Sequence, residues 1–203
     1  MVRIDHVVTS GIFSLDGEDF EVDNNIWIVG NDEEVVVLDA AHDHRPILEA
    51  VRGRTVRAII CTHAHNDHIN AAVELAEEAD APILLHPDDA MLWEVVHPDR
   101  RVDDQLRHGQ TIAIGGAELR VLHTPGHSPG GVCLHLPQEQ TVFSGDTLFN
   151  GGPGATGRSF SDRSQLEHSI RESLFVLPAA TTVHTGHGES TSIDAELRGS
   201  ADW

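Results

Sequence analysis

Short apolar runs and amphipathic segments follow one another along most of the chain. Runs rich in β-branched residues predict strands over 25–30, 33–40, 54–62, 82–86 and 181–185. Paired runs with turn residues between them predict hairpins over 110–123 and 131–145. Apolar residues at helical spacing predict helices over 43–52, 67–79, 87–97, 162–177 and 192–198. Strands and helices therefore alternate, which is typical of a layered α/β domain with its chemistry in loops at strand ends.

Nothing in the sequence indicates a second domain, a membrane span or a signal peptide. No linker-like stretch or short repeat interrupts its 203 residues, so we expect one domain over 1–203. No apolar run approaches the roughly 18 residues of a membrane span, and the N-terminal segment lacks the apolar stretch of a signal peptide. We therefore expect a cytoplasmic protein without a membrane partner. Its two cysteines, Cys61 and Cys133, lie in apolar runs and are expected to be buried thiols.

The net charge of the chain limits the kinds of molecule that it is expected to bind. The chain has 33 acidic residues against 13 basic ones, all of them Arg, which gives a formal charge of −20. Binding to phosphates needs clustered Lys and Arg, so nucleic acid is not expected as a partner.

Histidine is unusually frequent, with 15 residues, and the densest cluster is the segment Thr62–His68. His63 and His65 can point their rings at one position from an extended turn, whereas Asp67 and His68 open the following helix and can face a second position. Imidazole and carboxylate together suit Zn, Fe(II) or Mn(II) better than the all-oxygen sites of Ca or Mg. The segment therefore predicts a metal site where a buried strand meets a helix.

Three more candidate ligands occur in the same setting, at a strand end with small neighbours that leave room for an ion. His127 lies in the turn 124–131, Asp146 follows the strand that ends at Gly145, and His187 follows the strand 181–185. His184 is three residues before His187, so the two-residue period of a strand predicts that it faces away from the site. Asp39, at the end of the run VVVLDA, is a further acidic residue at a strand end.

In these motifs, and in their order from Asp39 to His187, the chain resembles the metallo-β-lactamase superfamily and, within it, the glyoxalase II-like branch. The resemblance implies a four-layer αβ/βα sandwich. It implies that one metal is held by His63, His65 and His127. It implies that a second metal is held by Asp67, His68 and His187, with Asp146 as the bridge between the two. Asp39 would support the ligands from behind without binding metal itself.

The resemblance also implies a reaction. Two divalent ions, most readily Zn²⁺ with Fe or Mn as alternatives, would share a hydroxide that attacks a carbonyl group, with Asp67 and Asp146 as the catalytic carboxylates. A thiolate, with a reference pKa of about 8.5, leaves without a strong general acid, and none stands out in the motifs. We therefore expect a hydrolase of small thioesters.

The segment after Asp146 carries the expectations about substrate. Gly145–Phe149 followed by Gly157 and Arg158 resembles the glyoxalase II pattern, so Arg158 is expected near the thiol portion of the substrate, and the glycine-rich loop 150–157 is a candidate lid. Full-length glyoxalase II holds glutathione with basic and Tyr side chains of a C-terminal extension. This chain has no Lys or Tyr and ends 16 residues after His187. The usual grip on glutathione therefore does not carry over to this chain, and we expect the thiol carrier to be glutathione, mycothiol or a similar small thiol.

Other functions of the same fold stay open. A mononuclear Fe(II) persulfide dioxygenase would use His63, His65 or its equivalent, His127 and Asp146. A lactonase or β-lactam hydrolase is a third possibility, and the acidic charge disfavours the nuclease branch. A metal-binding module without catalysis also has the necessary ligands. The sequence does not define the acyl group, the native metal or the oligomeric state.

Overall fold

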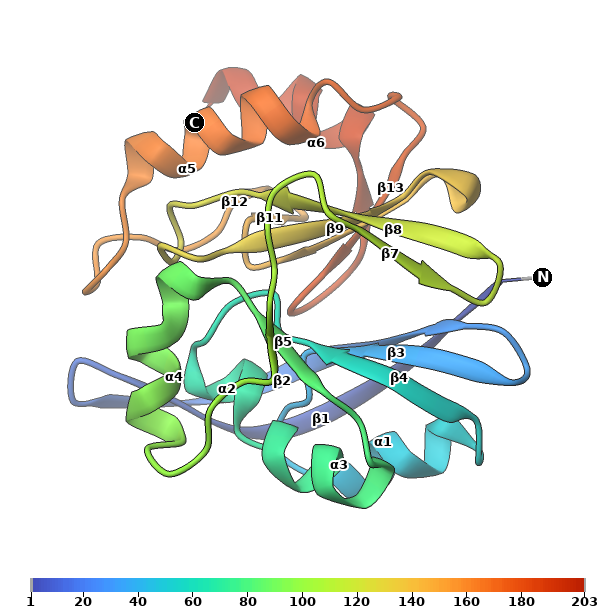
Figure 1. The fold of residues 1–203 in the computed structure, drawn as a ribbon. Helices are drawn as coiled ribbons and strands as arrows, with labels where there is room; N and C mark the ends of the chain where they lie inside the picture. The colour runs from blue at the N-terminus through green and yellow to red at the C-terminus, as the bar shows by residue number, and fades with distance from the viewer. Residues whose placement is uncertain (1, 203) are drawn as a thin grey trace.

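The computed structural model describes residues 2–202. Two six-stranded sheets pack face to face, and helices cover the outer face of each sheet (Figure 1). The helices α1 and α3 lie below the lower sheet in this view, and α5 and α6 lie above the upper one. The four-layer αβ/βα sandwich expected from the sequence is therefore confirmed.

The first sheet has the order β1-β2-β3-β4-β5-β6, antiparallel from β1 to β3 and parallel from β3 to β6. Its strands are β1 (Arg3–Leu15), β2 (Glu18–Gly30), β3 (Glu34–Leu38), β4 (Thr55–Ile60), β5 (Ile83–Leu85) and β6 (Asp104–Gln105). The helical segments on its side are α1 (His44–Val51), α2 (Asn66–Ile69), α3 (Ala72–Ala79), the 3₁₀ turn Pro87–Asp89 and α4 (Ala90–Val96).

The second sheet has the order β14-β13-β10-β9-β8-β7. Its strands are β7 (Thr111–Ile114), β8 (Ala117–His123), β9 (Val132–Leu136), β10 (Thr141–Gly145), β13 (Thr182–Thr185) and β14 (Thr191–Ser192). A short pair, β11 (Leu148–Phe149) and β12 (Gly152–Pro153), follows β10. The helices on this side are α5 (Arg163–Ser169), continued by a π-helical turn over Ile170–Leu174, and α6 (Ile193–Gly199).

The apolar runs of the sequence fill three layers. In β3, Val35 and Val37 pack toward the helices, while Val36 and Leu38 pack between the two sheets. Both faces of such a strand are buried, which explains its unbroken apolar run. A third cluster lies between the second sheet and α5, and it includes Cys133. Cys61 and Cys133 are both buried free thiols, as expected.

The N-terminal hairpin is the main element that the sequence reading did not predict. The strands β1 and β2 pair over 13 residues each, and Asp16 and Gly17 form the turn with φ of 54° and 79°. Two successive positive φ angles favour Asp-Gly, because Gly has no Cβ and Asp tolerates this region. The hairpin reaches past the sheet toward the loop that carries Arg158.

Two long helices of the sequence reading are shorter or divided. The helix expected over 67–79 breaks into α2 and α3, because Ala71 donates its N–H to the carbonyl of Ala40 and the Asn70 side chain accepts the N–H of His42. The helix expected over 162–177 begins at its Asp162 cap but ends in the π-helical turn at Leu174.

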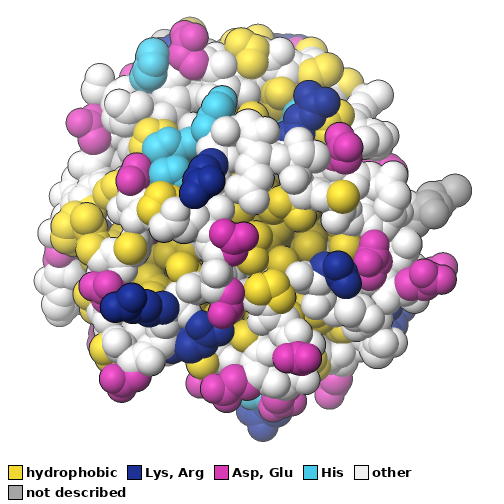
Figure 2. Space-filling view, viewed as in Figure 1, with side chains coloured by type: hydrophobic (Ala, Val, Ile, Leu, Met, Phe, Trp, Pro, Cys, Tyr) yellow, Lys and Arg dark blue, Asp and Glu magenta, His cyan; other side chains and the backbone are white. Residues whose placement is uncertain are grey.

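The surface agrees with the strong negative charge. Figure 2 shows Asp and Glu side chains dispersed around the viewed face, while hydrophobic side chains gather at its centre. Within residues 2–202, no helix has both the length and the apolar character that crossing a membrane requires.

Candidate metal centre

The side chains predicted as metal ligands converge where several loops meet at the ends of β4, β10 and β13. The chain brings them together from the loop after β4, from α2, from the β8–β9 loop, and from the ends of β10 and β13. In chain order they are His63, His65, Asp67, His68, His127, Asp146 and His187. Their nitrogen and oxygen atoms form overlapping groups of three that are close enough to hold metal ions: His63, His65 and His127; His63, His68 and Asp146; and Asp67, His68 and His187.

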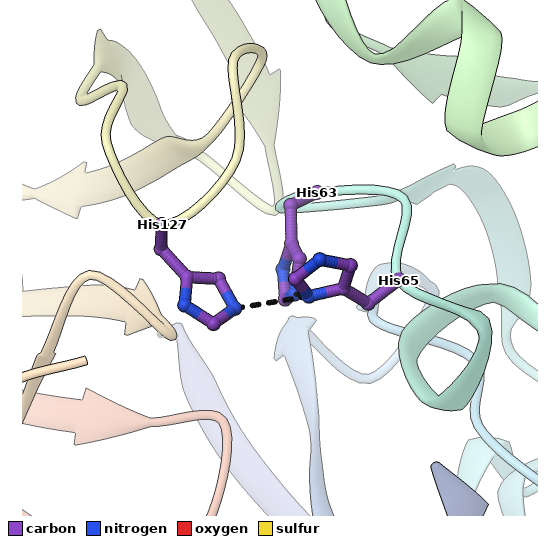
Figure 3. Close-up of side chains that lie close together, drawn as sticks. All are labelled: His63, His65 and His127. Atoms are coloured by element: carbon purple, nitrogen blue, oxygen red, sulfur yellow. Dashed lines mark hydrogen bonds between the residues drawn. The ribbon is translucent and has the colours of Figure 1, made fainter. Parts of the chain in front are cut away.

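The first group, called here the three-histidine group, consists of His63, His65 and His127. Nε2 of His63 lies 3.1 Å from Nδ1 of His65, which lies 3.0 Å from Nε2 of His127. Figure 3 shows the three rings directed toward one another. Ligands at tetrahedral positions about 2.05 Å from a zinc ion are roughly 3.3 Å apart. The spacing of these nitrogens therefore fits a cation.

The second group, called here the mixed group, consists of Asp67, His68 and His187. Nε2 of His68 lies 3.2 Å from Nε2 of His187. Oδ2 of Asp67 lies 3.3 Å from Nε2 of His187 and 3.5 Å from Nε2 of His68. The mixed group has the same ligand spacing as the three-histidine group but includes a carboxylate.

Asp146 lies between the two groups. Its Oδ2 is 3.5 Å from Nε2 of His127 and 3.5 Å from Nε2 of His187. Its Oδ1 is 3.4 Å from Nε2 of His68. A single carboxylate thus faces both groups, as a bridge between two ions requires.

Asp39 fixes two of the rings from behind. Its carboxylate accepts hydrogen bonds from the Thr62 N–H at 2.7 Å, from Thr62 Oγ1 at 2.7 Å and from His68 Nδ1 at 3.0 Å. Thr62 Oγ1 in turn lies 3.1 Å from Nδ1 of His63. Because Nδ1 of each ring is occupied, Nε2 is directed into the centre.

Backbone carbonyls fix two other rings in the same way. His127 Nδ1 donates to the carbonyl of Ala155 at 2.8 Å, and His187 Nδ1 donates to the carbonyl of Asp23 at 2.7 Å. Each contact selects one tautomer and again leaves Nε2 for the centre.

The two groups differ in their protonation. Burial lowers the pKa of His63 well below its usual value and that of His65 to about 3, so both rings are neutral. Burial also disfavours a charge on His187, but Asp146 and Asp67 outweigh it and raise its pKa to about 10. The same carboxylates raise the pKa of His68. Positive charge therefore collects at the mixed group.

Two carboxylate oxygens of the centre also indicate that it fits a metal ion. Oδ1 of Asp67 and Oδ1 of Asp146 are buried and have no hydrogen-bond partner in the described part of the chain. A buried carboxylate oxygen without a donor costs free energy, which a cation would remove. The residues present therefore fit divalent metal ions.

Two glycines allow the loops to approach this closely. A Cβ on Gly186 would overlap Oδ1 of Asp146 and come within 2.8 Å of Cε1 of His68. A Cβ on Gly145, which has a φ of 48°, would overlap Thr62 Oγ1. The ends of β10 and β13 can therefore meet the ligands only because these positions lack side chains.

Arg158 reaches a small cavity beside the three-histidine group. The cavity has a volume of about 50 Å³ and is lined by Phe13, Leu15, His65, His127, Ala155, Arg158, Ser159 and Ser161. Nη1 of Arg158 pairs with Oε2 of Glu18 at 2.7 Å, and its guanidinium lies 4.9 Å from the centre of the Phe20 ring. The N-terminal hairpin thus holds Arg158 at the cavity.

The glycine-rich loop 150–157 is fastened to the body of the protein. Gly154 donates its N–H to the carbonyl of Thr147 at 3.2 Å, and Gly151 donates to the carboxylate of Glu196. Ala155 holds His127, as described above. The loop covers one side of the centre, and its opening as a lid stays a prediction.

Some residues near the centre were not singled out by the sequence. Asn24 donates from Nδ2 to Oδ2 of Asp67 at 3.1 Å, and His42 Nε2 contacts Oδ1 of Asn24 at 2.8 Å. His184 instead stacks on Trp27, with ring centres 4.1 Å apart, and contacts Ser190. It therefore faces away from the metal centre, as predicted.

A family model for the metallo-beta-lactamase superfamily matches residues 20–187. The chain belongs to this superfamily. Among curated relatives, it is 33% identical over 186 residues to the probable metallo-hydrolase YqgX of Bacillus subtilis, covering 85% of this chain and 88% of the relative. It is 31% identical over 162 residues to a hydroxyacylglutathione hydrolase of Mesorhizobium japonicum, covering 76% of this chain but only 57% of that enzyme.

Solved structures of this superfamily share the fold. The B3 metallo-beta-lactamase BLEG-1 superposes with a TM-score of 0.80 at 29% identity, covering 94% of this chain and 97% of the other. TTHA1623 in a di-iron-bound form gives 0.79 at 34% identity, covering 88% and 94%. ETHE1 from Myxococcus xanthus gives 0.76 at 28% identity, covering 94% and 82%.

Proposed function

We propose that this member of the superfamily is a metal-dependent hydrolase of small-molecule thioesters. One observation carries the proposal: the three-histidine group and the mixed group lie side by side with Asp146 facing both. This arrangement supports two divalent ions, and the small cavity lined by His65, His127 and Arg158 adjoins it.

The cations fit the donor set best as Zn²⁺, with Fe or Mn as alternatives. When bound, they would polarise a carbonyl group and lower the pKa of a water molecule enough to make it a nucleophile at neutral pH. His63, His65 and His127 would hold one ion. Asp67, His68 and His187 would hold the other, and Asp146 would face both.

Asp67 and Asp146 are the carboxylates that face the reacting groups. Burial opposes the charge of Asp67, but His68 and His187 together lower its pKa to about 2. Asp67 would hold one ion, and its buried Oδ1, which has no hydrogen-bond partner in the described part of the chain, could accept a hydrogen bond that orients the attacking water.

The surroundings of the centre favour a thioester over an amide. A thiolate leaves readily because its conjugate acid has a pKa of about 8.5, whereas an amide nitrogen must be protonated as it leaves. The cavity next to His65 and His127 is lined by the apolar side chains of Phe13, Leu15 and Ala155 together with Ser159, Ser161 and Arg158. Arg158 is the basic residue that we assign to the thiol portion of the substrate.

The likeness to hydroxyacylglutathione hydrolase supports this reaction class, although this chain spans little more than half of that relative. The thiol carrier is a small thiol such as glutathione or mycothiol. Oxidation of a persulfide at a single iron is the second candidate, because ETHE1 shares the fold at 28% identity. TTHA1623, at 34% identity, shows that this fold can hold iron, although it holds two irons.

The test combines metal analysis with parallel assays. Metal content is measured in the protein as purified, and lactoyl, formyl and acetyl thioesters of glutathione and mycothiol are then assayed side by side. We expect two metal ions per chain and turnover of at least one thioester. One iron per chain, with oxygen consumption and no thioester turnover, would overturn the proposal in favour of the second candidate.

A further inference from the structure

Asp89 is a fully buried acidic residue whose carboxylate contacts two loops of the metal centre. It lies at the start of α4, but within the described chain its side chain forms no capping hydrogen bond to that helix. Its Oδ2 instead accepts the N–H of Ala64 at 2.9 Å and the hydroxyl of Ser128 at 2.8 Å. Its Oδ1 accepts the N–H of Gly130 at 2.5 Å.

The donors belong to the loops that carry the three-histidine group. Ala64 lies between His63 and His65, and Ser128 directly follows His127. One carboxylate oxygen is therefore shared by the two loops whose ligand nitrogens lie 3.0 Å apart. A change at this oxygen would alter the separation of the loops, and with it the distance from His127 to the other two rings.

We propose that Asp89 is a positioning residue for the three-histidine group, and that it sets the metal affinity of this group selectively. The inference rests on the proposed metal centre. It assigns to Asp89 neither a metal ion nor a substrate atom, because the residue acts through the backbone next to the ligands.

The surroundings of Asp89 are built for this role. Burial raises the pKa of the Asp89 carboxyl, while hydrogen bonds from Gly130, Ser128 and Ala64 oppose this effect. The close approach of Gly130 also requires a glycine, because a Cβ there would lie 2.7 Å from the Asp89 nitrogen and 2.8 Å from its Cβ. A buried carboxylate that accepts several hydrogen bonds holds its partners firmly, since leaving any of them unpaired is costly.

The mixed group is held by different residues. Asp39 positions His68, and the carbonyl of Asp23 positions His187. The hydrogen bonds of Asp89 described above end at the β4–α2 and β8–β9 loops and do not include these residues. Loss of the Asp89 carboxylate should therefore affect one metal position and spare the other.

The test is a cobalt titration of the metal-free full chain, for wild type and Asp89→Asn. Asn has nearly the same shape, but it replaces one acceptor oxygen with a donor that faces N–H and O–H groups. We expect wild type to bind two equivalents. In Asp89→Asn, one equivalent should bind about ten- to hundredfold more weakly, while the affinity for the other is unchanged. Anomalous diffraction from cobalt-loaded crystals should locate the reduced occupancy at the three-histidine group.

Two further variants keep the result interpretable. Asp32→Asn is the matched control, because Asp32 has a side chain that is 93% exposed and lies 3.2 Å from Arg3, away from the ligand loops. It should leave both affinities unchanged. Ser128→Ala removes one of the three donors and should give a smaller loss at the same metal position, which provides a measurement even if Asp89→Asn does not fold.

The outcomes separate the two proposals. If wild type binds no cobalt, the proposed metal centre is wrong. If wild type binds two equivalents and Asp89→Asn binds both as tightly as wild type, or loses affinity equally for both, the positioning role is wrong. An equal effect of Asp32→Asn would also overturn it.

Discussion

The three-histidine group and the mixed group share Asp146, yet the protein treats their imidazole rings in opposite ways. Burial keeps His63 and His65 neutral. Carboxylates keep His68 and His187 charged, because Asp67 and Asp146 face both rings. In the metal-free chain the mixed group therefore holds its positive charge as protons, which a metal ion would have to displace, whereas His63 and His65 already offer neutral nitrogens. Similar spacing of ligand atoms can therefore hide different electrostatic demands.

The largest effect should follow from removing the carboxylate that the groups share. Asp146→Ala should weaken metal binding at both groups and lower kcat/KM for a thioester by about three powers of ten or more, because several kcal/mol of transition-state stabilisation are lost. Metal analysis and steady-state kinetics measure the two effects. Near-normal turnover with full metal content would rule out the bridging role.

A pair of single-ligand variants tests whether the groups are independent. His127→Ala and His187→Ala each remove one ring, from the three-histidine group and the mixed group respectively. Each variant should retain one of two cobalt equivalents, and cobalt anomalous diffraction should place the remaining ion at opposite groups. Loss of the same ion from both variants would contradict the division made here.

Asp39→Asn should give a smaller effect, felt at both groups, because Asp39 holds His68 directly and His63 through Thr62. The variant keeps the shape of the side chain and tolerates the φ of 58° at this position, but it weakens the acceptor for His68 and Thr62. We expect metal affinity to fall by about ten- to hundredfold. Calorimetric titration would measure this change, and an unaltered affinity would exclude a role for Asp39 in holding His68.

Variants of Arg158 test whether the substrate approaches the centre from the side of the three-histidine group. The cavity of Arg158 adjoins that group alone. Arg158→Ala should raise KM for the thioester severalfold with little change in kcat. The matched variant Glu18→Gln breaks the ion pair but keeps the arginine, so its KM should stay near wild type. The exposed pair itself contributes less than about 1 kcal/mol to stability. Equal kinetics for the two variants would remove Arg158 from the substrate site.

The smallest effect is expected at His184. Burial without a carboxylate in contact sets the pKa of this residue, whereas carboxylates set the pKa of His187. Burial and the nearby His6 lower the pKa of His184 to about 4, whereas His187, three residues further on, is raised to about 10. Below pH 6.5 the unfolded chain gains a proton at His184 before the folded one does. Stability is therefore lost as pH falls from about 6.5 toward 4. His184→Phe should lose less stability over this range in urea unfolding at several pH values, and an identical pH dependence would contradict the assignment.

The sequence predicted which side chains come together at the centre, because their signal is local. Four candidates lie within His63–His68, and the remaining three share one setting, at a strand end beside glycine. Asp89 gave no such signal. It meets Gly130 across 41 positions of sequence, and only the packing of β5 and α4 against the β8–β9 loop brings them together.

The hairpin of β1 and β2 was missed for a different reason. Its outer half is largely solvent-exposed, so the apolar alternation that marks a half-buried strand is weak there. The dipeptide Asp16-Gly17 was the available signal, because it is among the strongest short-range indicators of a hairpin. Its contacts with Arg158 and Ser159 depend on tertiary structure and carry no local pattern.

Gly145 and Gly186 make the centre sensitive to substitution at positions that have no side chain to take part in its chemistry. Neither residue offers a donor atom from a side chain, yet a single methyl group at Gly186 would push against Asp146 and His68 together. In a survey of random substitutions, these positions should tolerate change as poorly as the histidines do. Mutational intolerance in this protein therefore marks the space that the ligands need as well as the ligands themselves.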